Sequence, residues 1–285
     1  MMNTLLLTIQ TLYIHWNPSE VMLRIGGFEL RWYSMCWLVG LAVGYLLMRR
    51  LYRQQKLGME KFEPLFIYVF LGILVGARLG HCLFYEPQYF LSAWDHMVEM
   101  IIPVRHLDDG QWKFVGYQGL ASHGGVAGLL AALWLYCRRM KMNGWVVLDN
   151  FGICAPITSC FIRLGNLMNS EIIGKPTDMP WAFIFERVDM QPRHPGQLYE
   201  AIAYLVFFII ILYVYRKNPR KVGTGLFFGL CLTLIFTFRF IIEYTKEIQE
   251  AFEAGLPIDM GQILSLPLIA IGVWSIVRSR KQKNA

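Results

Sequence analysis

The sequence predicts an all-α polytopic membrane protein with about seven transmembrane helices. Hydrophobic residues make up 55% of the 285 residues, charged residues only 16%, and the mean hydropathy is +0.40. The apolar residues gather in blocks of about 20, which is the length of a helix that crosses a bilayer. Short clusters of Lys and Arg border these blocks, as is typical of the loops that set membrane topology.

The chain divides into three parts of different character. We expect an interfacial arm over residues 1–29, a transmembrane domain over 30–277 and a basic tail over 278–285. Pro18 and a Gly26-Gly27 turn interrupt the arm, so it is too short to span. It also lacks the basic start of a cleaved signal peptide.

Seven apolar blocks give the predicted spans within the transmembrane domain. Their approximate limits are residues 30–48, 64–84, 120–137, 145–162, 197–215, 223–242 and 259–277. Asp259 and Gln262 form a capping-box pattern at the start of the last span. Two polar loops, 85–118 and 163–196, join spans two to three and four to five, and residues 181–188 predict one strand of a small hairpin.

The distribution of Lys and Arg predicts the orientation. Of the 27 Lys and Arg residues, 16 follow spans one, three, five and seven, and most of the others lie on the opposite side. Because cytoplasmic loops carry the excess of basic residues, we expect a cytoplasmic C-terminus and an N-terminus outside. Both long polar loops then face outward.

Composition also argues against several function classes. The net charge of +7 is spread over loops beside apolar blocks, so it does not indicate a nucleic-acid partner. The six cysteines show no C-x-x-C pairing, and no H-E-x-x-H motif is present. We therefore expect no metal site and no cofactor.

The polar stretch that follows the fourth span is the first candidate site. Arg163 and Asn166 are three residues apart, so they share one face if the helix continues for another turn. Gly174 lets the backbone approach a ligand closely, and Glu171 is placed to orient Arg163. The alternative interpretation is a snorkelling arginine beside polar loop caps.

Arg239 lies inside the sixth apolar block, where an isolated charge costs about 2.5–3.5 kcal/mol. One interpretation is a structural ion pair with Glu243, four residues further on the same helical face. The other is that Arg239 faces a cavity and binds an anion, with Glu243 positioning it. A guanidinium group suits this role because its planar fork matches two phosphate oxygens.

His123 opens the third span, followed by Gly124 and Gly125. A histidine accepts a proton near neutral pH and is therefore a candidate base, although a lone histidine is more often structural. Further candidates are the polar and aromatic residues near the outer ends of spans: Tyr33, Arg78, His194, Gln197, Tyr199 and Glu200.

Taken together, these motifs resemble the prolipoprotein diacylglyceryl transferases of bacterial inner membranes. The resemblance covers most of the chain and rests on the order and spacing of short motifs. They are Trp32-Tyr33, Gly76-Ala-Arg-Leu-Gly80, His123-Gly-Gly125, Arg163-Leu-Gly-Asn166 through Glu171 and Gly174, His194-Pro-Gly-Gln-Leu-Tyr-Glu200, Phe238-Arg239 with Glu243, and Met260-Gly-Gln-Ile-Leu-Ser265.

The resemblance implies a transfer of the diacylglyceryl group from phosphatidylglycerol to the lipobox cysteine of a preprolipoprotein. It implies a thioether product, release of glycerol phosphate, and an active site on the periplasmic side. It further implies catalytic roles for His123, Arg163 and Arg239. The residues that it implies for lipid binding are Tyr33, Gly124, Asn166, Glu171, Gly174 and Glu243.

The sequence departs from the family pattern at two places. Ile235 stands where a tyrosine is frequent, and the loop around residues 95–118 is longer than usual. Two other function classes stay open at this point, namely another phospholipid-handling membrane enzyme and an anion transporter. A transporter more often shows repeated halves, and the sequence shows no internal repeat.

Overall fold

The computed structural model describes residues 13–102, 104–106, 111–114, 119–247 and 258–282. The chain forms two compact units, one from Met1–Leu51 with Trp145–Ala285 and the other from Tyr52–Gly144. Residues 1–12 of the N-terminal arm and parts of the loop 85–118, including the Asp108-Asp109-Gly110 segment, lie outside the described residues.

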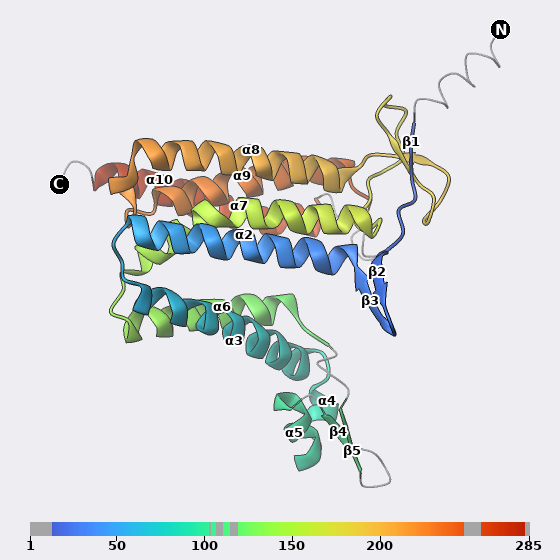
Figure 1. Ribbon diagram of the computed structural model, residues 1–285, viewed down its shortest axis with the longest axis horizontal. Coiled ribbons are helices and arrows are strands. Elements are labelled where there is room, and N and C mark those ends of the chain that lie inside the picture. The colour runs from blue at the N-terminus through green and yellow to red at the C-terminus, as the bar shows by residue number, and fades with distance from the viewer. Residues whose placement is uncertain (1–12, 103, 107–110, 115–118, 248–257, 283–285) are drawn as a thin grey trace. The chain divides into compact units, whose positions relative to one another are not determined.

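The first unit is a helical bundle whose long helices lie side by side (Figure 1). Helix α8 packs on α9, and α9 packs on α10. Glycines permit the closest approaches, because a Cβ on Gly152 of α7 would lie 2.6 Å from a carbonyl oxygen of α9. The bundle helices are α2 (Trp32–Gln54), which continues into the second unit, α7 (Gly144–Met168), α8 (Gly196–Lys217), α9 (Leu226–Ile242) and α10 (Met260–Lys281).

Short strands cover one end of this bundle. Strand β1 (Ile14–Trp16) pairs in parallel with β6 (Phe183–Phe185), which pairs antiparallel with β7 (Pro192–Arg193). The predicted strand within 181–188 is therefore confirmed. Strands β2 (Val21–Ile25) and β3 (Phe28–Arg31) form a hairpin through the Gly26-Gly27 turn. Two short 3-10 helices follow α8 and α9, namely η1 (Pro219–Lys221) and η2 (Glu243–Thr245).

The second unit is built on the contact between α3 (Met59–Phe84) and α6 (Ser122–Arg139). Glycines four residues apart line both helices, a spacing that lets helix backbones touch inside membranes. A Cβ on Gly76 would lie 2.4 Å from the carbonyl oxygen of Gly124. Between these helices the chain forms α4 (Pro87–Phe90), α5 (Trp94–Ile101) and the hairpin of β4 (Val104–His106) and β5 (Trp112–Phe114).

Helices occur at all seven positions where the sequence predicts spans. Six of them, α2, α3, α7, α8, the helix starting at Leu226 and α10, are long and apolar enough to cross a membrane. Helix α6, with 18 residues, includes His123, Arg138 and Arg139 and is not among these six. Its span therefore stays a prediction.

Two boundaries are informative. The capping box of Asp259 and Gln262 is present at the start of α10. The same helix continues to Lys281, so the first residues of the predicted tail are helical.

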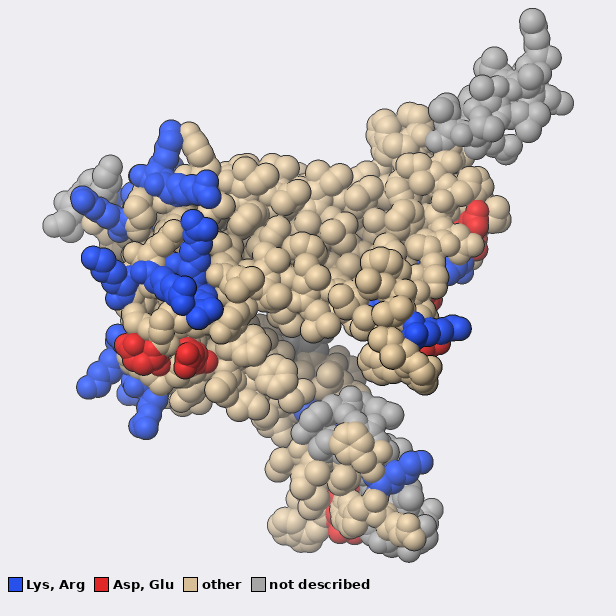
Figure 2. Space-filling model, in the orientation of Figure 1, with Lys and Arg blue, Asp and Glu red and all other residues tan. Residues whose placement is uncertain are grey.

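Lys and Arg side chains gather at the C-terminal ends of α2, α8 and α10 (Figure 2). We call this the basic end of the first unit.

Close contact at Gly76 gives a test of the fold. We expect Gly76→Ala to destabilise the second unit by about 1–3 kcal/mol, because the added methyl group overpacks the α3–α6 contact. Thermal unfolding of the purified protein in detergent measures the effect. Gly27→Ala is the control, since a Cβ there meets nothing within 4 Å. Equal midpoints for both variants would contradict the packing argument.

Candidate active site

A fully buried carboxylate lies at the end of the first unit opposite the basic end. Glu200 is 0% exposed, and its Oε2 lies 3.0 Å from Nε of Arg163. Its Oε1 lies 3.2 Å from Nζ of Lys246 and accepts a hydrogen bond of 3.1 Å from the Tyr204 hydroxyl. Two cations and a hydroxyl thus compensate one buried negative charge, which is what burial of an ion requires.

The antiparallel run of the helices brings these residues together. Arg163 belongs to the C-terminal part of α7, and Glu200 lies in the first turns of α8. Lys246 directly follows η2, which continues from the end of α9. Chain segments that are distant in sequence therefore meet at one end of the bundle, as Figure 1 shows for α7, α8 and α9.

Backbone hydrogen bonds fix the position of Lys246, which is only 4% exposed. Gly174 forms an isolated antiparallel bridge with Lys246, and its N–H donates to the carbonyl of His194 at 2.9 Å. A Cβ on Gly174 would lie 2.5 Å from the His194 Cβ and 2.8 Å from the Thr245 carbonyl. Only a glycine at position 174 lets its segment lie this close to those of His194 and Thr245. Because the Gly174 N–H already donates to His194, it is not a donor for a ligand.

Amide side chains extend the charge network. Arg163 donates to Oδ1 of Asn166 at 3.3 Å, which confirms that both residues share a face of α7. Asn166 and Asn169 donate to the two carboxylate oxygens of Glu171, at 3.1 and 2.9 Å. The expectation that Glu171 orients Arg163 directly is wrong, because Glu200 takes that role and Glu171 acts through Asn166.

Glu243 also has a different partner from the one the sequence suggests. Its Oε2 lies 3.3 Å from Nζ of Lys246, and a Cβ on Gly261 would lie 2.7 Å from its carboxyl carbon. Within the described residues, no hydrogen bond or ion pair joins Glu243 to Arg239. The predicted structural pair is therefore wrong, because the buried ammonium group is the nearer cation.

Arg239 is the cation of this region that stays available. It lies in the last turns of α9 and is partly buried, and the described part of the chain offers it no hydrogen bond or ion pair. Leu164, next to Arg163, and Phe238, next to Arg239, pack against the same buried cluster around Tyr204, so the two arginines lie in one region of the bundle. The arrangement suits an anionic ligand.

Four predicted residues line the surroundings of this network. The Tyr33 ring packs against Gly165, the residue before Asn166. A Cβ added to Gly165 would lie 3.1 Å from this ring. Gln197 is fully buried and donates to the carbonyl of Glu171. The Tyr199 hydroxyl accepts from Trp181 at 2.8 Å and lies 3.3 Å from Nδ1 of His194. Burial lowers the pKa of His194 below its ordinary value.

Arg193 braces the loop that precedes α8. Its Nε lies 3.1 Å from each carboxylate oxygen of Asp189, and another nitrogen donates to Glu247 at 3.0 Å. The same guanidinium group donates to the Gly174 carbonyl at 3.2 Å. Hydrogen bonding to Arg193 holds the pKa of Asp189 below its usual range. The loop is thereby tied to the segment that carries Lys246.

Three predicted residues belong to the second unit. His123 lies in the first turn of α6 with an exposed side chain, and Gly124 packs against α3. Arg78 is buried, donates to the Glu99 carbonyl at 2.8 Å and lies 5.0 Å from the centre of the Phe90 ring. Arg78 therefore anchors α4 and α5 to α3.

Sequence reasoning missed Lys246 and Tyr204. In the sequence, Lys246 follows the sixth apolar block, and only its position three residues after Glu243 indicates a pair. Tyr204 follows Glu200 by four residues, the spacing of neighbours on one helical face. That signal was available, but an aromatic residue inside an apolar span is more often part of the packing.

A helical bundle with six described helices that are long and apolar enough to cross a membrane, and with a buried ionic site at one end, defines a polytopic membrane protein. The family model for prolipoprotein diacylglyceryl transferase matches residues 20–278, and the chain belongs to this family.

Relatives in several bacteria are named phosphatidylglycerol–prolipoprotein diacylglyceryl transferase. The chain is 53% identical over 283 residues to that of Bacteroides fragilis, with 99% of both chains covered. It is 43% identical over 271 residues to that of Tolumonas auensis, with 95% of this chain and 99% of the relative covered. The corresponding protein of Porphyromonas gingivalis is 38% identical over 287 residues.

Removal of the central negative charge tests the network. We expect Glu200→Gln to destabilise the protein by about 3 kcal/mol, because it leaves the partly buried Arg163 and the buried Lys246 without their shared partner. The midpoint of thermal unfolding in detergent measures this loss. Glu29→Gln, which removes an exposed carboxylate from the β2–β3 hairpin, is the control. A midpoint like that of the control would exclude Glu200 as the centre of the network.

Proposed function

We propose that this chain transfers the diacylglyceryl group of phosphatidylglycerol to the lipobox cysteine of a preprolipoprotein. The cysteine sulfur forms a C–S bond to the glyceryl carbon while the C–O bond to the phosphate breaks. Glycerol phosphate leaves, and the thiol proton passes to a base. The single observation that carries the proposal is Arg239, a guanidinium group in an apolar helix whose described surroundings leave it open to an anion, close to Arg163.

The two arginines have distinct tasks in this proposal. Arg239 binds the phosphate of the lipid, since its guanidinium group has no hydrogen bond or ion pair elsewhere in the described structure. Arg163, held by Glu200 and Asn166, presents a fixed positive charge. Negative charge gathers on the phosphate oxygen as the C–O bond breaks, and preorganised donors in a site of low dielectric stabilise it most effectively.

The nucleophile needs activation, because a free cysteine thiol has a pKa of about 8.5 and is mostly protonated at neutral pH. We assign the base role to His123, whose exposed imidazole at the start of α6 is accessible to a substrate thiol. Tyr33, Asn166, Glu171 and Glu243 position the arginines and the lipid headgroup in this proposal.

The proposal places the reaction on the periplasmic side of the bacterial inner membrane. Support comes from charge, since Lys and Arg gather at the C-terminal ends of α2, α8 and α10 (Figure 2), whereas Glu200 lies in the first turns of α8. Basic clusters of this kind stay in the cytoplasm. The ionic site then lies at the opposite membrane surface, where a secreted lipobox segment arrives.

Release of glycerol phosphate tests the proposed reaction. Purified protein is incubated with phosphatidylglycerol and a lipobox peptide, and both glycerol phosphate and the lipidated peptide are quantified. We expect Arg239→Gln to lower the rate about 100-fold or more, the usual cost of a lost transition-state donor. Arg24→Gln, an exposed arginine paired with Glu29, is the control. No product from the wild-type chain beside an active relative would reject the assignment.

The pH dependence of a histidine variant tests the base. We expect His123→Gln to be about 100-fold slower at pH 7 and to recover as the pH rises past about 8.5, because the thiol then ionises unaided. His96→Gln is the control, since His96 stacks on Tyr89 within the second unit. Unchanged activity of His123→Gln at neutral pH would remove the base role.

A further inference from the structure

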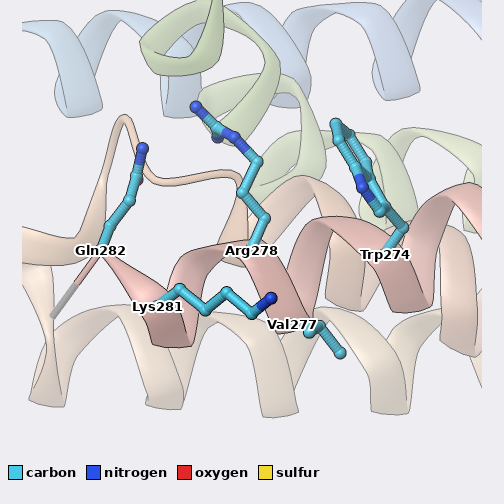
Figure 3. Close-up of a pocket in the computed structure, with 5 residues that line it drawn as sticks. All are labelled: Trp274, Val277, Arg278, Lys281 and Gln282. Atoms are coloured by element: carbon cyan, nitrogen blue, oxygen red, sulfur yellow. The ribbon is translucent and has the colours of Figure 1, made fainter. Parts of the chain in front are cut away.

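A pocket of about 350 Å³ lies at the basic end of the first unit, far from the candidate active site. Its lining comes from the last turns of α10 and the residue that follows the helix: Trp274, Val277, Arg278, Lys281 and Gln282 (Figure 3). Along the helix axis, about 25 Å separates Arg278 from the N-terminal turn at Gly261, which contacts Glu243. The pocket therefore belongs to the other membrane surface.

Arg278 is held rigidly at this pocket. Its guanidinium carbon lies 4.1 Å from the centre of the Trp145 ring, and one terminal nitrogen donates to the Thr224 carbonyl at 3.1 Å. These contacts fix the plane of a group that has five N–H donors. Donors remain for a ligand, because the described residues give Arg278 no carboxylate partner.

Lys281 supplies a second cation three residues further along α10. Its side chain runs along the helix so that Nζ lies toward Val277, whereas Arg278 and Trp274 project together from the helix (Figure 3). For Lys281, too, the described part of the chain records no hydrogen bond or ion pair. Two cations with unused donors thus border one pocket.

The rest of the lining is apolar and exposed. Trp274 is 56% exposed and Val277 46% exposed, although both lie on a helix suited to crossing a membrane. The centre of the Trp274 ring lies 5.9 Å from that of the Trp145 ring, on which Arg278 stacks. The two rings and the guanidinium group therefore form one cluster. Tryptophan favours the headgroup level of a bilayer, which places this pocket at the boundary between lipid tails and water.

We propose that this pocket binds an anionic phospholipid that is not the reacting substrate. Its phosphate bonds to Arg278 and Lys281, and its glycerol backbone and first acyl carbons cover Trp274 and Val277. A guanidinium group fixed by stacking suits phosphate oxygens, and the exposed apolar residues distinguish a lipid from a free anion.

Binding of dioleoylphosphatidic acid to the full chain in non-ionic detergent tests the proposal. Native mass spectrometry gives the dissociation constant, and all proteins carry Arg239→Gln to weaken binding at the candidate active site. We expect Arg278→Gln with Lys281→Gln to weaken binding at least about tenfold, as the loss of charge-assisted hydrogen bonds implies. Lys281→Gln alone weakens it about threefold without disturbing the Trp145 stack.

Matched controls separate this site from general attraction to a basic surface. Arg216→Gln with Arg280→Gln removes the same charge from exposed positions at the same end, and we expect less than a twofold change. Dioleoylphosphatidylcholine binds more weakly than phosphatidic acid, and millimolar orthophosphate does not displace the lipid. Equal loss in the control pair, unchanged binding in the pocket variants, or displacement by orthophosphate would overturn the proposal.

Discussion

The buried carboxylate of Glu200 is the constraint on which the polar end of the first unit depends. A charge removed from water is tolerated only with close partners, and the penalty without them amounts to several kcal/mol. Arg163 and Lys246 flank Glu200 at 3.0 and 3.2 Å. These contacts tie together the end of α7, the start of α8 and the segment after α9, so one ion determines how three distant segments meet.

The distribution of charge around Glu200 leaves one cation of this region without an internal partner in the described structure. Glu200 and Glu243 share Lys246, Glu200 also holds Arg163, and Glu171 is satisfied by two amides. Arg239 is left outside these pairs in the described structure. A membrane bundle that neutralised every cation internally would present no site for phosphate. The network therefore stabilises the fold and leaves positive potential in one place.

Local signals in the sequence predicted more than long-range ones. The positions of the long helices, the capping box of Asp259 and Gln262, and the shared face of Arg163 and Asn166 follow from periodicity and spacing within one helix. The partners of Glu171 and Glu243 were predicted wrongly, although the actual partners lie even closer in sequence. Because α7 ends at Met168 and α9 at Ile242, both carboxylates lie beyond the regular helix, where helical spacing no longer determines which side chains meet.

The helix that supplies a tyrosine hydroxyl beside the two arginines is another feature that spacing within one helix does not predict. Ile235 stands where the family pattern often places tyrosine, and here it packs against the cluster of Cys160, Ala201 and Tyr204. Tyr204, from α8, donates to Glu200 and interacts electrostatically with both Arg163 and Arg239. A hydroxyl is thus present beside the arginines although α9 does not carry it. Because a bundle presents several helices to one region, a polar group lost from one helix is compatible with the same site when a neighbouring helix carries another.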